Sequence, residues 1–322
     1  MTHPTIAVLE PGYAAYDTET RVLAAHDAKI APIGADVPAV PALQALDPVA
    51  LLVRERIVDA AVLDACPNLQ VVVRYGVGVD NIDLDHARTR GIKVANVPDY
   101  GAEHEVSEHA VALYLAVQRR ILSRDTEVRD GAWGIGQAAM IPSRAGSVLG
   151  LIGCGKIGLK AAEKFRALGF EAVLVFDPYL PTEAAANAGV ELATLEDLCR
   201  RADVVSLHAP LTPETRHILN AERIALMKPT SIVINVSRGG LVEEAALANA
   251  LGEGRLFGAG IDVFEVEPVA QDNPLLRAPN TLLSDHAAWY SERSVEVLQR
   301  NAATEIARVL SGEAPRNWVN PW

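Results

Sequence analysis

The chain has few cysteines, and they are not arranged as a disulfide framework. Cys66, Cys154 and Cys199 are an odd number, lie far apart and include no Cys-x-x-Cys pair. Small secreted domains that depend on disulfides have many closely spaced cysteines, so this set is typical of a reducing compartment. We interpret Cys154 as a small packing residue, with a reactive thiol as the alternative.

The sequence also lacks targeting and membrane signals. The first residues, Met1–Thr5, are not a basic segment followed by a long apolar stretch, which argues against a secretory signal. No uninterrupted apolar run approaches the length that a bilayer span requires. We therefore expect a cytoplasmic protein without a membrane partner.

Basic residues are in the minority. The 29 lysines and arginines stand against 41 acidic residues, a net charge of -12, whereas nucleic-acid binding needs a basic face. We therefore expect no nucleic-acid partner, while a protein partner stays open. The length of 322 residues suggests roughly two domains, and the 50% hydrophobic content is ordinary for a soluble enzyme.

The first hundred residues alternate short apolar runs with helix-like segments. Runs rich in β-branched residues predict strands, and the segments between them predict crossover helices. The expected strands are 6–9, 50–53, 71–73 and 92–95, and the expected helices lie near 17–29, 57–65 and 83–90. This alternation indicates a small α/β domain with a parallel sheet.

A glycine-rich segment separates this part from the next. We expect a helix over 102–122 and irregular structure over 123–146, and a loop of that length is usually functional. We interpret 123–146 as a dimerisation arm on a second subunit, because its apolar side chains otherwise lack a core. A flap over its own domain is the alternative. The apolar residues are Trp133, Ile135, Met140 and Ile141.

From Ser147 a second series of strand–helix pairs begins, with later strands expected at 204–207, 231–235, 258–261 and 281–283. A final helix over 291–311 is expected to return to the first domain. The predicted fold is α/β, with two Rossmann-like or flavodoxin-like parallel-sheet domains. One comprises 1–98 with 291–322 as the substrate domain, and the other comprises 99–290 and binds NAD. A cleft between two domains is the usual place for a ligand.

A glycine motif opens the second domain. An apolar run over 147–152 leads into a Gly-x-Gly-x-x-Gly turn, a helix over 156–168 and a second apolar run, and Asp177 follows about twenty residues after the turn. Such a turn lets the backbone approach a pyrophosphate, and the helix N-terminus offers free N–H groups. The combination predicts dinucleotide binding. The motif is Gly153-Cys154-Gly155-Lys156-Ile157-Gly158.

The acid also indicates which dinucleotide binds. A carboxylate at Asp177 can hydrogen-bond a ribose diol but repels a 2′-phosphate. The next residues, Pro178-Tyr179-Leu180, offer no arginine to hold such a phosphate. The sequence therefore favours NAD over NADP.

Three polar residues stand where later strands of the second domain end. Arg238, Glu267 and His286 each follow an apolar run. Ligands of an open parallel sheet lie beyond the carboxyl ends of its strands, so we expect the three to converge on the nicotinamide. Taken singly, each has an ordinary alternative: a surface ion pair, a solvated acid and a hydrogen-bonded strand-end residue.

The three residue types suit hydride transfer to a carbonyl. The alkoxide that forms needs a proton, which a histidine near neutral pH can give, and in reverse take. A carboxylate beside that histidine favours the imidazolium and fixes its orientation. An arginine binds a substrate carboxylate as a planar fork. We therefore expect His286 as acid/base, Glu267 as its partner and Arg238 as the substrate-binding residue, with no metal.

With these motifs the chain resembles the D-isomer-specific 2-hydroxyacid dehydrogenases over nearly its whole length. The segments that carry the resemblance are GCGKIG at 153–158, NVSRGG at 235–240, DVFEVEP at 262–268 and DHAA at 285–288, with GVGVDNID at 76–83 and NVP at 96–98. Within the family, Arg74 and the segment 286–292 most resemble the C-terminal binding protein co-repressors and their bacterial relatives. The resemblance implies the same roles for the three strand-end residues.

The resemblance also implies roles for other residues. Asp262 would hydrogen-bond the nicotinamide amide, and His208, Ala209 and Pro210 would line the adenine side. The other cofactor contacts expected are Gly153, Gly155, Lys156, Ile157, Gly158, Asp177, Pro178, Thr215, Val236, Ser237, Arg238, His286, Ala288 and Ser107.

For the substrate, the resemblance implies anchoring by Arg74 and by the backbone of Val77 and Gly78, beside Arg238 and His286. Trp289 would form a wall against an apolar tail. The alternatives are an interdomain ion pair for Arg74 and plain interdomain packing for Trp289.

The segment from His104 to His109 superficially resembles a zinc-protease helix. Five residues apart, the two histidines are turned about 140° from each other on a helix and cannot share a metal. We expect no metal there. Ser107, near the domain junction, is the residue of this helix that we expect near the cofactor.

Two functions remain in competition. The first is an NAD-dependent dehydrogenase or reductase of a small 2-oxo or 2-hydroxy acid. The second is an NAD(H)-sensing scaffold, motivated by the resemblance to co-repressors. The complete set of Arg238, Glu267 and His286 favours the enzyme. A formate- or phosphite-type oxidation is disfavoured, because Trp289 and the surroundings of His286 resemble the co-repressor branch.

Overall fold

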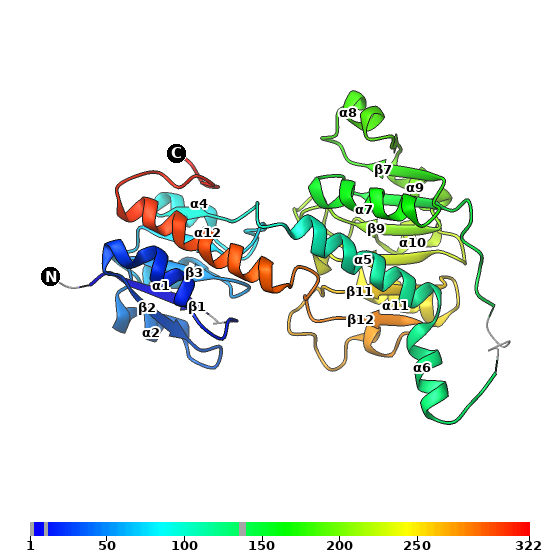
Figure 1. Cartoon of the computed structure of the whole chain (residues 1–322), viewed down its shortest axis with the longest axis horizontal. Helices are drawn as coiled ribbons and strands as arrows, with labels where there is room; N and C mark the ends of the chain where they lie inside the picture. The colour runs from blue at the N-terminus through cyan, green and yellow to red at the C-terminus, as the bar shows by residue number, and fades with distance from the viewer. Residues whose placement is uncertain (1–2, 10–11, 135–139) are drawn as a thin grey trace. The chain divides into compact units, whose positions relative to one another are not determined.

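The computed structural model describes residues 3–9, 12–134 and 140–322. The chain divides into two compact units, one of residues 1–101 with 291–322 (unit 1) and one of residues 102–290 (unit 2), and each has its own sheet (Figure 1). Ile135, one of the apolar residues of the predicted arm, lies outside the described residues. In the part of the chain that the structure describes, no helix is both long and apolar enough to cross a membrane.

Unit 1 is built on a five-stranded parallel sheet in the order β2-β1-β3-β4-β5. Its strands are β1 (Thr5–Leu9), β2 (Lys29–Ile33), β3 (Ala50–Val53), β4 (Val71–Arg74) and β5 (Lys93–Ala95). Its helices are α1 (Asp17–Leu23), η1 (Ala24–His26), α2 (Ala39–Leu46), α3 (Ala60–Asp64), α4 (Leu84–Thr89) and α12 (Glu292–Leu310). All four strands predicted here are present.

Two elements of unit 1 were not predicted. Strand β2 carries Pro32 and is mostly unburied, because it pairs on one side only, with β1. A proline and a weak apolar pattern are typical of an edge strand, which sequence patterns identify poorly. Helix α2 follows it and was likewise missed.

Residues 291–322 belong to unit 1. Ser291 caps α12 by accepting a hydrogen bond from the Ser294 backbone, and Leu298 and Ile306 are buried on one face of the helix, which packs on α1. Beyond α12, the Asn320 side chain accepts from the backbone N–H of Val94 at 2.7 Å, beside β5. The chain end is thus joined to the edge of the unit 1 sheet.

Unit 2 is built on a seven-stranded parallel sheet in the order β12-β11-β10-β9-β6-β7-β8. Its strands are β6 (Val148–Ile152), β7 (Ala172–Phe176), β8 (Glu191–Leu192), β9 (Val204–Leu207), β10 (Ile232–Asn235), β11 (Gly258–Ile261) and β12 (Thr281–Leu283). Its helices are α5 (Ala102–Gln118), α6 (Ile121–Arg129), α7 (Lys156–Ala167), α8 (Thr182–Asn187), α9 (Leu195–Arg201), α10 (Ala221–Ala225), η2 (Gly239–Leu241), α11 (Glu244–Gly252) and η3 (Pro274–Arg277). The predicted α/β class with two parallel sheets is confirmed.

Helices cover both faces of this sheet. Helices α5 and α7 pack together on one face (Figure 1), where Gly260 lets α5 approach so closely that a Cβ there would lie 2.7 Å from the Cβ of Leu113. Ala259 points the other way, because side chains alternate along a strand. It belongs to an apolar cluster with Leu198 of α9 and Leu247 of α11. A sheet covered on both faces leaves its strand ends as the place for a ligand.

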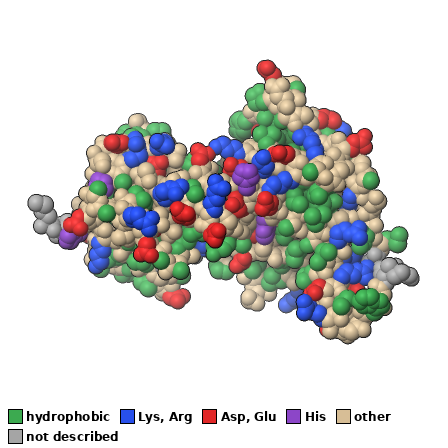
Figure 2. Space-filling model, in the orientation of Figure 1, with side chains coloured by type: hydrophobic (Ala, Val, Ile, Leu, Met, Phe, Trp, Pro, Cys, Tyr) green, Lys and Arg blue, Asp and Glu red, His purple; other side chains and the backbone are tan. Residues whose placement is uncertain are grey.

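The segment after α5 differs from the prediction. The expected helix over 102–122 is interrupted at Arg120, whose φ is +51°, and residues 121–129 form α6, so the prediction of irregular structure from 123 was wrong for 123–129. Helix α6 buries none of its residues. Large hydrophobic side chains of this segment are exposed, and green side chains lie at this part of the surface in Figure 2. The exposed side chains include Ile121, Leu122, Val128, Trp133 and Met140.

Candidate functional site

The predicted site residues of unit 2 line one edge of its sheet. All strands are parallel, so residues that follow them lie at the same carboxyl edge. Neighbouring strands β6 and β9 form the switch point, with β7 and β8 on one side and β10 to β12 on the other. In sheet order the strand-end residues are His286 after β12, Glu267 after β11, Arg238 after β10, His208 after β9, Gly153 after β6 and Asp177 after β7.

The glycine turn is closely packed on one side and open at its centre. Gly153 has a φ of +89°, and a Cβ there would lie 2.6 Å from the backbone nitrogen of Ala209. A Cβ on Gly158 would lie 2.6 Å from the carbonyl oxygen of Gly153. Among the described residues, nothing lies within 4 Å of a Cβ built on Gly155, just before α7 begins at Lys156. The turn therefore fits a phosphate group at the open helix N-terminus.

Asp177 is fixed beside this turn. Its Oδ2 accepts a hydrogen bond from the backbone of Cys154 at 2.8 Å, and its Oδ1 accepts from the backbone of Tyr179 at 2.9 Å. Among the residues that the structure describes, each oxygen retains a second lone pair, which is what a ribose diol requires. Burial raises the pKa of Cys154 to about 11, so this residue is a neutral thiol, as a packing residue would be.

His208 follows β9 on the other side of the switch point. Its Nε2 lies 2.9 Å from Ser206 Oγ, and its Nδ1 is buried with no partner among the described residues. Desolvation by burial lowers the pKa of His208 to about 4, so the imidazole is neutral at physiological pH. The residue as a whole is half-buried, and a neutral ring suits the apolar wall of an adenine site, which is the role predicted for it.

Other predicted cofactor contacts surround the same edge. Ser237 donates from Oγ to the carbonyl of Ala209 at 2.6 Å, which ties the end of β10 to the end of β9. Thr215 donates to the carbonyl of Pro210 at 2.7 Å and closes the loop after β9. Val236, between these strand ends, is buried. These residues shape the loops of the predicted site.

Ser107 is placed differently from the strand-end residues. It is fully buried within α5, and its Oγ donates to the backbone carbonyls of Glu103 and His104 in the preceding turn. The hydroxyl proton therefore serves its own helix. A contact of Ser107 with the cofactor stays a prediction.

Arg238 stands where β10 passes close to β11. The residue after it, Gly239, has no room for a side chain, because a Cβ there would lie 1.8 Å from the carbonyl carbon of Phe264. The Arg238 guanidinium donates from Nη1 to the carbonyl of Ser237 at 2.8 Å. This close approach places the arginine beside the loop that carries Glu267.

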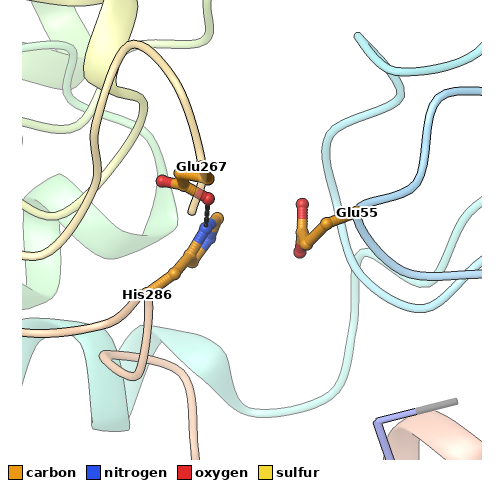
Figure 3. A group of neighbouring side chains, drawn as sticks. All are labelled: Glu55, Glu267 and His286. Carbon is orange, nitrogen blue, oxygen red and sulfur yellow. Dashed lines mark hydrogen bonds and ion pairs between the residues drawn. The ribbon is translucent and has the colours of Figure 1, made fainter. Parts of the chain in front are cut away.

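His286 and Glu267 form a hydrogen-bonded pair (Figure 3). Nδ1 of His286 lies 2.7 Å from Oε2 of Glu267, and Oε1 of Glu267 accepts from the backbone of Phe264 at 2.9 Å. A carboxylate accepts only, so Nδ1 carries the proton and Nε2 stays available for a substrate. Both side chains are partly exposed, at 19% and 28%. The pair can therefore exchange a proton with a bound molecule.

Asp262 organises the backbone around this pair. It is fully buried, its backbone carbonyl accepts from the N–H of His286 at 2.7 Å, and its carboxylate accepts from the N–H groups of Ala287 and Ala288 and from Ser284 Oγ. Three of the four lone pairs of the carboxylate are thus used among the described residues. The one that remains is on Oδ2, and the predicted contact of Asp262 with the nicotinamide amide stays a prediction.

The predicted substrate residues of unit 1 lie after β4. Arg74 is 6% exposed, and its guanidinium donates to Glu55 at 2.8 Å and to the carbonyl of Arg54 at 3.2 Å. The alternative predicted for Arg74 was an ion pair between domains, but this ion pair lies within unit 1, to which Glu55, also drawn in Figure 3, belongs. Val77 is exposed and Gly78 half-buried.

Trp289 lies three residues after His286 in unit 2. It is half-buried and packs edge-on against Tyr290, with ring centroids 5.7 Å apart. Its predicted role as a wall against the substrate stays a prediction.

One group near the pair was missed. Nε2 of His109, on α5, lies 2.8 Å from Ser284 Oγ, which donates to Asp262. The sequence drew attention to His109 only through its false likeness to a zinc motif, and His104 of the same helix is exposed. The contact joins residues 175 positions apart, so no local pattern indicates it.

The doubly wound sheet and the glycine turn at its carboxyl edge are typical of a dinucleotide-binding α/β protein. Residues 111–288 match the family model of the D-isomer specific 2-hydroxyacid dehydrogenase, NAD binding domain. The chain belongs to this family, and the predicted family and its NAD-binding domain are confirmed.

Several characterised proteins are similar to this chain. The D-3-phosphoglycerate dehydrogenase of Methanocaldococcus jannaschii is 41% identical over 260 residues, which are 80% of this chain and 49% of that protein. The glyoxylate reductase of Korarchaeum cryptofilum is 39% identical over 266 residues, 82% of this chain and 80% of that protein. The chain thus spans about half the length of the phosphoglycerate dehydrogenases that it matches.

Solved structures show the same fold. The D-lactate dehydrogenase of Aquifex aeolicus, in complex with NAD and lactic acid, superposes with a TM-score of 0.88 at 27% identity, covering 98% of this chain and 99% of that one. The glyoxylate/hydroxypyruvate reductase of Sinorhizobium meliloti, in complex with NADP and malonate, gives a TM-score of 0.83 at 28% identity over 100% and 98%. The closer likeness to the C-terminal binding proteins stays a prediction.

Proposed function

We propose that the protein is an NAD-dependent oxidoreductase that interconverts a small D-2-hydroxy acid and the corresponding 2-oxo acid. The hydrogen-bonded pair of His286 and Glu267, on the same sheet edge as the glycine turn, carries this proposal. A redox cofactor and a proton donor on one edge are the two components that reduction of a carbonyl requires.

The residues divide the chemistry between them. When bound, the reduced nicotinamide supplies the hydride to the carbonyl carbon. In the direction of reduction, His286 protonated on both ring nitrogens donates its Nε2 proton to the carbonyl oxygen, and in the reverse direction the neutral ring accepts that proton from the hydroxyl group on Nε2. Glu267 stabilises the imidazolium and holds Nδ1, while Arg238 binds the carboxylate of the substrate and polarises the neighbouring carbonyl.

We also propose that NAD is preferred over NADP. The Asp177 carboxylate beside the glycine turn would accept hydrogen bonds from the ribose diol and repel a 2′-phosphate. Because the S. meliloti relative is described with NADP, this preference needs measurement. Dissociation constants of NADH and NADPH, from quenching of tryptophan fluorescence, would decide it, and tighter NADPH binding would overturn it.

The substrate is proposed at the level of its class. The relatives act, by their names, on 3-phosphoglycerate, glyoxylate and lactate, which share a carboxylate next to a hydroxyl or oxo carbon. Arg74, Val77, Gly78 and Trp289 are proposed to contact the remainder of the molecule.

The test mixes the protein with NADH and each of a panel of 2-oxo acids, and the decrease in NADH absorbance measures turnover. The panel contains glyoxylate, pyruvate, hydroxypyruvate, its phosphate ester and oxo acids with apolar or thioether tails, because Trp289 suggests an apolar contact. His286→Ala should abolish turnover of any active acid while NADH still binds. Retained activity in that variant would remove His286 from the mechanism. No turnover on any acid, together with an NADH-dependent peptide partner, would favour the scaffold.

We further propose a cytoplasmic homodimer formed through residues 123–146. Helix α6 buries none of its own residues, and Trp133 and Met140 beyond it are 93% and 85% exposed, which supports an additional contact surface. Light scattering on the purified protein would measure the mass. A monomeric mass at micromolar concentration would contradict the proposed role of residues 123–146 as a dimerisation arm.

A further inference from the structure

The backbone of His286 is held in an unusual conformation. Its φ is +57°, in the left-handed region that residues other than glycine rarely adopt. Such a conformation is strained and persists only where the surroundings enforce it. The direction of the imidazole depends on this backbone, so whatever enforces it also positions the acid/base.

Asp262 is the group that enforces it. Its backbone carbonyl and its carboxylate together accept the three consecutive N–H groups of His286, Ala287 and Ala288, at 2.7, 2.9 and 3.0 Å. The carboxylate can do so only in one rotamer, because its two oxygens face different donors. The orientation of Asp262 therefore sets the orientation of the segment that carries His286.

Ser284 and His109 determine that orientation from the other side. Ser284 Oγ has one proton and lies 2.6 Å from Asp262 Oδ1, which can only accept, so the serine donates to the aspartate. At its contact with Nε2 of His109, at 2.8 Å, the serine must then accept. His109 therefore carries its proton on Nε2, and the same nitrogen lies 3.5 Å from Asp262 Oδ1.

We propose that His109 is a positioning residue that acts through Ser284 and Asp262 on the backbone of His286. The imidazole of His109 belongs to α5, which packs on β11 and β12, so the relay connects a rigid helix to the strand-end segment. The inference rests on the proposed function, because it assigns His109 a role in presenting the acid/base.

Variants that remove or restore the donor test the relay. His109→Leu removes the N–H donor, and His109→Gln supplies an amide N–H at about the same distance from the backbone. A small displacement of a reacting group can cost about 10²-fold in rate. We expect kcat to fall about 10- to 100-fold in His109→Leu. We expect KM to change less than about threefold and His109→Gln to recover most of the rate.

A double-mutant cycle tests whether the residues act as one chain. Ser284→Ala should lower kcat as His109→Leu does, and the double variant should be no slower than the slower single variant, because coupled residues are non-additive. His104→Leu, an exposed histidine of the same helix, is the matched control and should leave kcat unchanged. Additive losses, or an equal loss in His109→Gln and His109→Leu, would overturn the relay.

A readout without turnover separates this proposal from the proposed function. In ¹⁵N-labelled wild-type protein, the His109 ring should show its proton on Nε2, and the His286 ring should show its proton on Nδ1. His109→Leu and Ser284→Ala should shift or broaden the His286 ring resonances, whereas His104→Leu should not. If no 2-oxo acid is a substrate, the proposed function fails while these spectra still report on the relay. Unchanged His286 resonances in both relay variants would overturn it.

Discussion

The two halves of the carboxyl edge of the unit 2 sheet are built in different ways. At β6 and β7, the glycine turn is formed by backbone groups that pack so closely that Gly153 and Gly158 have no room for a Cβ. At β10 to β12, the site is held by side-chain hydrogen bonds: Glu267 pairs with the His286 ring, and the Asp262 carboxylate accepts from Ser284 Oγ and from the backbone of Ala287 and Ala288. The first half depends on the absence of side chains in the turn, and the second half depends on hydrogen-bond partners. We therefore expect different substitutions to disrupt each half.

The largest effect, on rate and stability taken together, is expected at Asp262, in the half that depends on partners. In Asp262→Asn the new amide group must face a donor, either the Ala288 N–H or the pair of Ser284 and Ala287, so at least one buried donor loses its acceptor. The free energy of unfolding should fall by about 2–3 kcal/mol. The rate constant kcat should fall about 10²-fold or more, because His286 loses its position. Urea denaturation and steady-state kinetics measure the two effects.

A wild-type rate in Asp262→Asn would contradict the assignment of Asp262 as the group that holds His286. If Asp262→Asn keeps the wild-type free energy of unfolding but loses kcat, Asp262 would act only as a contact of the nicotinamide.

The next effect is expected in the half that depends on space. Gly153→Ala puts a Cβ 2.6 Å from the Ala209 backbone at a φ of +89°, and should lower the free energy of unfolding by about 2–4 kcal/mol. Gly155→Ala is the matched comparison, because its Cβ meets nothing within 4 Å among the described residues and its φ is -71°. It should fold like the wild type and weaken NADH binding, since the methyl group lies where the phosphate is expected. Calorimetry measures the loss of stability in each variant, and NADH titration measures the loss of binding.

Equal destabilisation of Gly153→Ala and Gly155→Ala would contradict the difference in packing. If Gly155→Ala binds NADH as tightly as the wild type, the pyrophosphate does not bind at this turn.

These two halves also explain what the sequence could predict. The glycine turn, its helix and Asp177 are local in sequence, so their spacing alone indicates the dinucleotide end. The strand-end positions of Arg238, Glu267 and His286 follow from the buried runs before them. The contacts of Asp262 with Ser284 and of His109 with Ser284 depend on how α5 packs against β11 and β12, and no spacing encodes that. The edge strand β2 was missed for a local reason, because it carries a proline and has a weak apolar pattern.

A smaller effect concerns His208, at the border between the two halves. Its pKa is lowered to about 4 by burial, below its usual value of 6.5, so the unfolded chain binds more protons than the folded protein between these pH values. Protonation of His208 therefore has no effect on the free energy of unfolding above about pH 6.5. As the pH falls toward 4, it lowers the free energy of unfolding by about 2–3 kcal/mol in all. His208→Asn should reduce the loss of unfolding free energy between pH 7 and pH 4.5 relative to the wild type. Identical losses in both proteins would show that His208 is accessible to protons in the folded state.

The smallest effect is expected at Asp177, whose side chain bonds to the glycine turn in the half that depends on space. Asp177→Ala removes the acceptor for the ribose diol and the repulsion of a 2′-phosphate together, so NADH binding should weaken while NADPH binding changes less. The ratio of the two dissociation constants should narrow about tenfold, which corresponds to about 1.4 kcal/mol. The backbone N–H groups of Cys154 and Tyr179 lose an acceptor in this variant, so both dissociation constants also carry a common loss that cancels in the ratio. An unchanged ratio would mean that cofactor preference is set by the packing of the turn and not by this charge.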